Sequence, residues 1–342
     1  VPSPDERPTS STKTRFKAVY DDTHLYIGAI MENERSDLPT QAHFTQRNSP
    51  IFQKDSDFEI FVDMNGNHHH YKEFEANAIN TVWNLMLDKP YADGGMEHSA
   101  RVASDPSNPL YYEVHQQKTA TKVIRGTLND PDGHGATWSI EVALSYEDLW
   151  SHVQRYINDE EDTAPYPPMV GSMKRLNFSR VERRGDINWT WQPQRVWDPN
   201  QKRFVGFVDM HRPDAWGYLV FGPSKDTEKA TKDVNEESSR EDTRDPTWPA
   251  RLAAMNLYYA QQAYFEQSSE ASYAASLHEL QNLVDPTIIG PFDITLQTHS
   301  IVNPTTFKAT VVGNPDGSVI SVTHDRHIEI KRPQSDVMTK VE

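Results

Sequence analysis

Short stretches of alternating apolar and polar residues fill most of the first two thirds of the chain. Residues 16–29, FKAVYDDTHLYIGA, alternate on either side of Asp21 and Asp22, a pattern typical of a β-hairpin. Residues 58–63 alternate as well, and a turn-forming segment leads from them to residues 71–78, which we interpret as the returning strand. These patterns predict antiparallel strand pairs.

Further strand-like segments follow, and turn-forming residues separate them. Hardly any helical pattern precedes residue 145, where Ser145 stands as the expected N-cap of a helical turn over residues 145–156. Many short strands with few helices predict an antiparallel β-sandwich. The further strands are expected at residues 118–127, 137–144, 176–182 and 215–221.

The period of the pattern changes after Pro249. Leu252, Met255 and Tyr259 follow the spacing of an amphipathic helix, and residues 273–283 resemble a second helix. Strand-like segments come next, with a hairpin turn at residues 314–317. The C-terminal part is therefore predicted to be a small α+β domain, with its strands at residues 292–298, 306–312 and 318–323.

The predicted fold class is thus mainly β, an antiparallel β-sandwich followed by a small α+β domain. A charged run without aromatic residues separates the two patterns, and we interpret it as a solvated linker. The predicted organisation is an N-terminal extension at 1–13, the sandwich at 14–222, the linker at 223–247, the α+β domain at 248–332 and a C-terminal tail at 333–342.

The charge and composition narrow the classes of partner. With 34 Lys and Arg against 50 Asp and Glu, the net charge of −16 disfavours nucleic acid and anionic lipid. The chain has no cysteine, so disulfides and thiolate metal sites are excluded. No transmembrane segment is expected, and because the polar start lacks the apolar stretch of a signal peptide, we expect any such signal to have been removed.

Acidic residues alternate at the start of one predicted strand. Asp57, Glu59 and by extension Asp55 fall on one strand face, because side chains two apart point the same way. Such carboxylates bind sugar hydroxyls, hold calcium, act as acid and base in glycoside hydrolysis, or simply face solvent. The sequence leaves these alternatives open.

The turn after that strand carries three regularly spaced oxygen-bearing side chains. Asp63, Asn65 and Asn67 alternate, and Gly66 permits a tight bend between them. Their oxygens suit a calcium ion, whereas a plain hairpin turn explains the same residues. The metal hypothesis therefore names Asp63, Asn65 and Asn67.

Aromatic residues gather beside charged ones in two regions. Trp83, Asp88 and Tyr91 lie where a predicted strand runs into a polar loop, and a second group surrounds Trp191 and residues 210–217. Aromatic rings with neighbouring charges suit a pyranose, whose apolar face stacks and whose hydroxyls accept hydrogen bonds. Tryptophans that fill the sandwich core explain the same pattern.

Motifs of common catalytic centres are missing from the sequence. GxSxG, the P-loop and a GxGxxG that opens a helix do not occur. The chain is therefore expected not to be an enzyme and to need no organic cofactor.

Seven segments occur in an order that resembles a known family. FKAVYDDTHLYIGA, IFQKDSDFEIFVD, YKEFEANAINTVWNLMLDKPYADGG, TWSIEVALSYEDL, RLNFSRVE, NWTWQP and MHRPDAWGYLVF are together similar to the family 9 carbohydrate-binding-module-like proteins, over residues 14–222. The resemblance implies a jelly-roll-type sandwich that calcium stabilises and that binds glycan, in the founding members between two Trp rings. Phe52 and Met210 stand where these two rings are expected. The C-terminal part faintly resembles the soluble part of pilin-like folds.

The function expected from these features is non-catalytic binding of a polysaccharide or glycan by a secreted, periplasmic or cell-surface protein. A structural protein that self-assembles through the sandwich is the alternative. An enzyme that acts on glycans, with Asp57, Glu59, Asp88 or Asp93 as acid and base, is the third hypothesis. The residues expected to contact carbohydrate are Trp83, Asp88, Tyr91, Trp191, His211, Arg212, Trp216 and Phe52.

Overall fold

The chain forms two compact units, which we describe separately. The computed structural model describes residues 7–153, 167–182, 185–206, 209–223, 245–298 and 305–333. The first unit comprises residues 1–194 and 207–234, and the second comprises residues 195–206 and 235–342. Most of the expected linker at 223–247, nearly all of the expected tail at 333–342 and the end of the expected helical turn at 145–156 lie outside the described residues.

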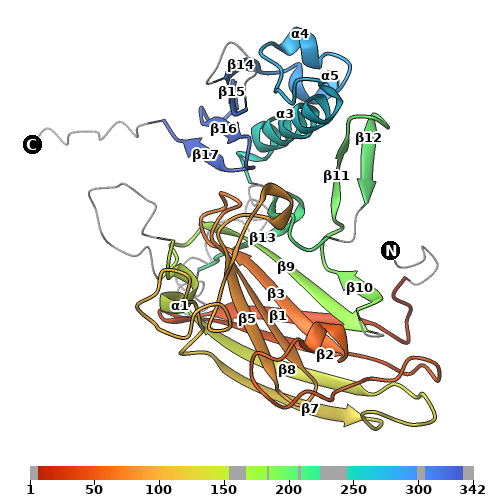
Figure 1. The fold of residues 1–342 in the computed structure, drawn as a ribbon. Helices are drawn as coiled ribbons and strands as arrows, with labels where there is room; N and C mark the ends of the chain where they lie inside the picture. Colours follow the sequence, from red (N-terminus) through yellow and green to blue (C-terminus); the bar gives the residue numbers. More distant parts are fainter. Residues whose placement is uncertain are drawn as a thin grey trace, which may run out of the picture. The chain divides into compact units, whose positions relative to one another are not determined.

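One sheet of the first unit is four-stranded. The predicted hairpin is confirmed, because β1 (Thr14–Tyr20) pairs antiparallel with β2 (His24–Met31). Strand β2 then pairs with β8 (Thr137–Ser145), and β8 pairs with β7 (Lys118–Arg125). The strand order is β1-β2-β8-β7, so the hairpin lies at one side of the sheet (Figure 1).

The other sheet of the first unit is seven-stranded, with the order β10-β9-β3-β4-β5-β6 and β13 paired to β9. The predicted return from residues 58–63 to residues 71–78 is confirmed, since β3 pairs antiparallel with β4. The strands are β3 (Asp57–Asp63), β4 (Tyr71–Asn77), β5 (Val82–Leu87), β6 (Glu97–His98), β9 (Met173–Glu182), β10 (Ile187–Thr190) and β13 (Gly217–Val220).

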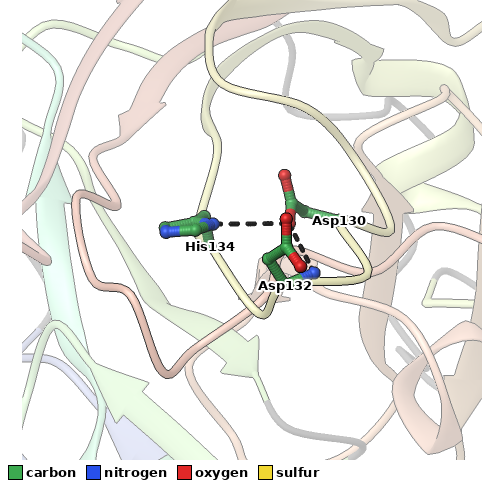
Figure 2. A group of neighbouring side chains, drawn as sticks. All are labelled: Asp130, Asp132 and His134. Atoms are coloured by element: carbon green, nitrogen blue, oxygen red, sulfur yellow. Dashed lines mark hydrogen bonds and ion pairs between the residues drawn. The ribbon is translucent and has the colours of Figure 1, made fainter.

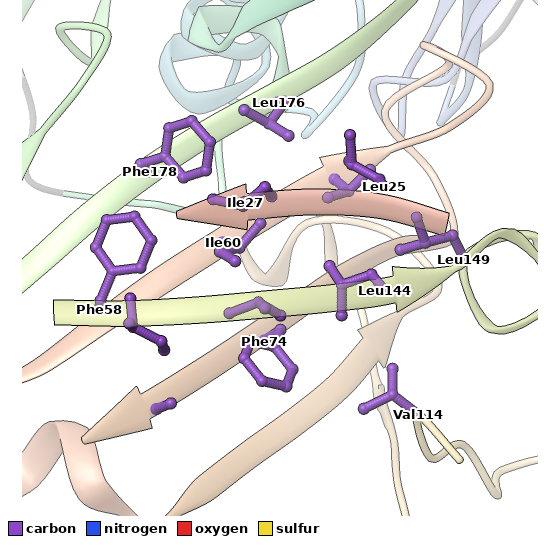
Figure 3. Packing of buried hydrophobic residues seen from close by; sticks show 14 of the residues in the cluster. Leu25, Ile27, Phe58, Ile60, Phe74, Val114, Leu144, Leu149, Leu176 and Phe178 are labelled. Atoms are coloured by element: carbon purple, nitrogen blue, oxygen red, sulfur yellow. The ribbon is translucent and has the colours of Figure 1, made fainter. Parts of the chain in front are cut away.

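Apolar side chains of both sheets form a single core. Leu25 and Ile27 of β2 and Leu144 of β8 belong to the same buried cluster as Phe58 and Ile60 of β3. Figure 3 shows these side chains converging between the strands. Two antiparallel sheets that bury their inner faces against each other form a β-sandwich, and this part of the predicted fold class is confirmed.

A short helix follows β8 at the position that the sequence predicts. Helix α1 (Tyr146–Trp150) begins after Ser145, whose side chain accepts a hydrogen bond from the backbone amide of Asp148. This bond satisfies one of the amide groups that a helix leaves unpaired at its first turn. Leu149 and Trp150 join the sandwich core, so α1 closes one edge of it.

The second unit combines a long helix with a four-stranded sheet. Helix α3 (Trp248–Gln267) shares a buried cluster with residues of the sheet β14-β15-β16-β17, such as Ala309 and Ile320. The small α+β domain is therefore confirmed, and the last strand of its sheet, β17, was not predicted from the sequence. The strands are β14 (Asp293–Thr298), β15 (Phe307–Val312), β16 (Val319–Thr323) and β17 (Ile328–Lys331).

Two features of the second unit differ from expectation. The helix expected over residues 273–283 is limited to α4 (Leu277–Leu280), and a further short helix, α5 (Pro286–Ile289), follows it. Strands β11 (Arg195–Asp198) and β12 (Arg203–Gly206) form a hairpin that was expected inside the sandwich range 14–222. It groups with the second unit because Trp197 is buried there and donates a hydrogen bond to the Leu283 carbonyl at 2.7 Å.

No helix among the described residues is both long and apolar enough to cross a membrane.

Candidate functional site

The outer face of the seven-stranded sheet carries an unusual row of acidic residues. Asp57 and Glu59 alternate with the core residues Phe58 and Ile60, so they project away from the sandwich core. Glu59 lies directly opposite Glu75 of β4, and Glu75 lies opposite Trp83 of β5. The register therefore places two carboxylates and an indole ring side by side across three neighbouring strands.

These carboxylates are buried, which the sequence did not indicate. Asp57, Glu59 and Glu75 are 0%, 5% and 1% exposed, so the alternative of a solvent-facing strand surface is wrong. Burial is the main cause that raises the pKa of Glu59 to about 8, and the neighbouring Glu73 adds to the shift. Burial, and then the repulsion of Glu59, raises the pKa of Asp57 well above its usual range.

Asp55 has a different structural role from Asp57 and Glu59. Its carboxylate accepts hydrogen bonds from the backbone amides of His43 and Phe44 and from the side-chain amide of Asn77. Asp55 is fully buried, and these donors replace the water that it loses. It therefore anchors the segment before β3 and is not part of the same strand face.

An aromatic group borders the acidic row at β5. Trp83 is half-buried, and the ring of Phe52 lies edge to face with it at a centroid distance of 5.4 Å. The guanidinium carbon of Arg101 lies 3.3 Å from the centroid of the Trp83 ring. Arg101 is held there by hydrogen bonds to Glu97 and to the Asn84 carbonyl. This arrangement offers an aromatic surface, a fixed cation and carboxylates within one region.

His211 connects the loop before β13 to the same face. Its Nδ1 lies 3.0 Å from the Tyr71 hydroxyl, and its Nε2 lies 3.9 Å from a carboxylate oxygen of Glu73. Its ring is 4.7 Å from the ring of Tyr91, which is 47% exposed. Burial of its inner part is the largest cause that raises the pKa of Tyr91 to about 12, so this phenol stays protonated at neutral pH.

The structure corrects the predicted platform in two positions. Trp216 is only 2% exposed and donates its indole proton to the Met210 carbonyl, so it fills a small core with Phe61 and Tyr71 beneath the loop. Trp191 packs against the sandwich core through Phe16 and Phe178. Both rings therefore fit the alternative, left open by the sequence, that these tryptophans pack into cores.

Asp88 and Arg212, which the sequence predicted to contact carbohydrate, form hydrogen bonds within loops near this face. One oxygen of Asp88 accepts hydrogen bonds from the backbone amides of Lys89 and Met96, which closes the turn after β5. Arg212 donates through Nε to Asp209 at 3.0 Å. Both side chains therefore position the loops that carry Tyr91 and His211.

The loop with the predicted calcium ligands is capped by its own backbone. The two oxygens of Asp63 accept hydrogen bonds from the amides of Gly66 and His68, and the Asn67 side chain accepts one from His69. These bonds are typical of Asx turns and satisfy the loop without a ligand. The residues Asp63, Asn65 and Asn67 fit the hairpin-turn alternative, and a calcium ion there stays a prediction.

Several residues of this face were missed by reasoning from the sequence. Glu73 and Glu75 alternate with apolar residues in YKEFEAN, and this pattern was sufficient to place both on the same face as Tyr71. Arg101 gave no signal, because it lies in an irregular segment far along the chain from Trp83.

Two groups of side chains in the described residues have the proximity that a metal ion requires. One is the buried set Asp57, Glu59 and Glu75. The other is Asp130, Asp132 and His134, which Figure 2 shows in the loop before β8. In this second group the Asp132 amide donates to Asp130 and lowers its pKa, and Asp132 and His134 are exposed. A solvated loop explains the second group.

The fold defines a mainly β protein whose candidate site lies on one sheet of a sandwich. The chain matches no protein-family model and no curated protein. Among solved structures it is similar to a "putative carbohydrate-binding protein" from Bacteroides uniformis, with 13% sequence identity and a TM-score of 0.40. The similarity covers 61% of this chain and 78% of the other.

Proposed function

We propose that this chain is a non-catalytic carbohydrate-binding protein and that it binds a glycan around Trp83 of β5, on the outer side of the seven-stranded sheet. The observation that carries the proposal is the half-buried Trp83, with the guanidinium of Arg101 held against its ring. An indole ring stacks on the apolar face of a sugar, and fixed charged groups hydrogen-bond to its hydroxyls. Assignment to family 9 and an exported location are parts of the proposal that rest on sequence resemblance.

Tyr91 and His211 extend this surface. Tyr91 is exposed and protonated, so its hydroxyl donates and accepts hydrogen bonds. The Tyr71 hydroxyl fixes the imidazole of His211 beside it. Side chains that are held before the ligand arrives lose little conformational entropy on binding, which favours affinity.

The burial of the acids supports binding without catalysis. Glycoside hydrolysis needs one carboxyl group at the leaving oxygen and a second at the sugar or at a water molecule. Asp57 and Glu59 are 0% and 5% exposed, so neither reaches a glycosidic bond on the surface. Asp88 is engaged by two backbone amides. These three of the four acids expected for an enzyme are thus poorly placed for that chemistry.

The test is affinity electrophoresis of the full chain in gels that contain plant, algal or bacterial polysaccharides. Trp83→Ala is expected to weaken binding about tenfold or more, because aromatic anchors contribute upwards of about 1–2 kcal/mol. The matched control is Trp248→Ala, which removes an indole that is 39% exposed in the second unit. This control is expected to bind as the wild type does.

Two results would contradict the proposal. One is that no polysaccharide retards the wild-type protein. The other is that Trp83→Ala, with a circular dichroism spectrum like that of the wild type, retains full retardation.

A further inference from the structure

Three carboxylates meet at one point of the outer sheet face. Asp57 and Glu59 project from β3, and Glu75 lies directly opposite Glu59 on β4. One oxygen from each carboxylate lies within 4.8 Å of the other two. Calcium binds oxygen at about 2.3–2.6 Å, so two ligands of the same ion are up to about 5 Å apart. The three oxygens therefore have the spacing of ligands around one cation.

Four oxygens of these carboxylates lack hydrogen-bond partners. Both oxygens of Asp57, one oxygen of Glu59 and one of Glu75 are buried without a donor. Buried carboxylate oxygens are normally hydrogen-bonded, paired with a basic side chain or bound to a metal. A second and independent observation thus indicates that this place suits a positively charged ligand.

Basic side chains of the described residues do not pair with these three carboxylates. Arg180 of β9 lies opposite Phe58, on the inner face of the sheet, and pairs with Glu182. Lys72 of β4 alternates with Glu73 and points to the inner face, where its ammonium group donates to the His70 carbonyl. No ion pair in the described residues includes Asp57, Glu59 or Glu75.

We propose that Asp57, Glu59 and Glu75 bind one divalent cation of the oxygen-preferring class, represented by Ca²⁺. Three carboxylates carry enough negative charge to hold a hard cation, and their burial limits screening by solvent. Burial, and then the repulsion between neighbouring acids, raises the pKa of Asp57, Glu59 and Glu75, and a bound cation would relieve that repulsion. The site uses other residues than the Asp63 loop, and it does not depend on the proposed glycan binding.

The first experiment is titration calorimetry of the metal-free full chain with CaCl₂. The wild type is expected to bind one ion saturably, and Asp57→Asn and Glu75→Gln are each expected to weaken binding at least tenfold. Asp130→Asn is the matched control, since it neutralises an acid in the exposed group of Figure 2. This control and Trp83→Ala are expected to bind Ca²⁺ as the wild type does.

Thermal unfolding supplies a readout that a purely structural role would not give. In EDTA, Glu75→Gln removes the cost of burying an acid beside Asp57 and Glu59, so its Tm is expected to exceed that of the wild type by about 2–4 °C. In CaCl₂ the order is expected to reverse, because only the wild type gains stability from the bound ion.

The proposal is overturned if the wild type releases no binding heat with Ca²⁺ at millimolar concentration and its Tm is the same in EDTA and CaCl₂. It is also overturned if Asp130→Asn weakens binding as strongly as Glu75→Gln does. A protein that binds Ca²⁺ but no polysaccharide would refute the proposed function alone.

Discussion

The two faces of the seven-stranded sheet differ chemically at the start of β3, although side chains on both faces are buried there. On the inner face, Phe58 and Ile60 of β3 pack into the sandwich core. On the outer face, the intervening residues Asp57 and Glu59 are buried together with Glu75 of the next strand. Packed apolar side chains stabilise the fold, whereas buried carboxylates that lack partners cost stability. The following experiments test that contrast.

The largest effect on stability is expected from the inner face. Phe58→Ala removes a ring that is 1% exposed and stacks on Phe178 with a centroid distance of 5.5 Å. The loss of buried area and the cavity left behind are expected to lower the free energy of unfolding of the sandwich unit by about 3–5 kcal/mol. Urea unfolding followed by near-ultraviolet circular dichroism measures this loss.

Val312→Ala provides the control for this experiment, since Val312 is 40% exposed in the second unit. It is expected to change the free energy of unfolding by no more than about 0.5 kcal/mol. A loss below about 1 kcal/mol for Phe58→Ala would show that the inner face does not carry the stability of the sandwich.

A smaller and pH-dependent effect is expected from Lys72, a buried basic residue of the inner face. Burial lowers its pKa from 10.5 to about 7, although Asp63 partly opposes this shift. Between these values the unfolded chain binds a proton that the folded chain does not, so the free energy of unfolding rises with pH. The rise attributable to Lys72 is about 1.4 kcal/mol per pH unit between pH 8 and 10.

Urea unfolding of Lys72→Met at several pH values measures this contribution as a difference from the wild type. The variant is expected to lose that part of the slope. Lys122→Met, at an exposed position of β7, is expected to keep the wild-type slope. Equal slopes for the wild type and Lys72→Met would contradict the buried position of this ammonium group.

The smallest effect is expected at the polar link between the outer face and the loop before β13. Tyr71→Phe removes the fully buried hydroxyl that bonds to His211 and is expected to lower the free energy of unfolding by about 0.5–1.5 kcal/mol. The matched control is Tyr111→Phe, which breaks a tyrosine–histidine contact with His115 at the surface. Equal losses in the two variants would mean that burial adds nothing to the Tyr71 contact.

Alternation along the strands was sufficient to predict much of the sandwich. A period of two and the turn residues around Asp21 located the first hairpin, and the same pattern located β3 and β4. The N-cap Ser145 marked the start of α1, because a serine before an acidic turn satisfies free amide groups locally. Each of these features depends on residues close together in the chain.

The site was predicted less completely, because it depends on contacts between distant residues. Trp83, Tyr91, His211 and Phe52 were expected together, and the structure links Trp83 with Phe52 and Tyr91 with His211. Trp191 and Trp216 also lie near aromatic and charged residues in the sequence, but their rings pack into cores. The residue type alone does not distinguish a ring that packs inward from one that lines a surface.

The sequence by itself determined the strand alternation, the turns, the helix cap and the change from a β pattern to a helical one, because these follow from backbone preferences over a few residues. Only the tertiary structure decided that the outer face is covered, that Glu59 meets Glu75, and that Arg101 lies on Trp83. The physical reason is that strand register and burial arise from pairing between segments far apart in the chain. That pairing converts an ordinary polar strand face into a buried group of unpartnered carboxylates.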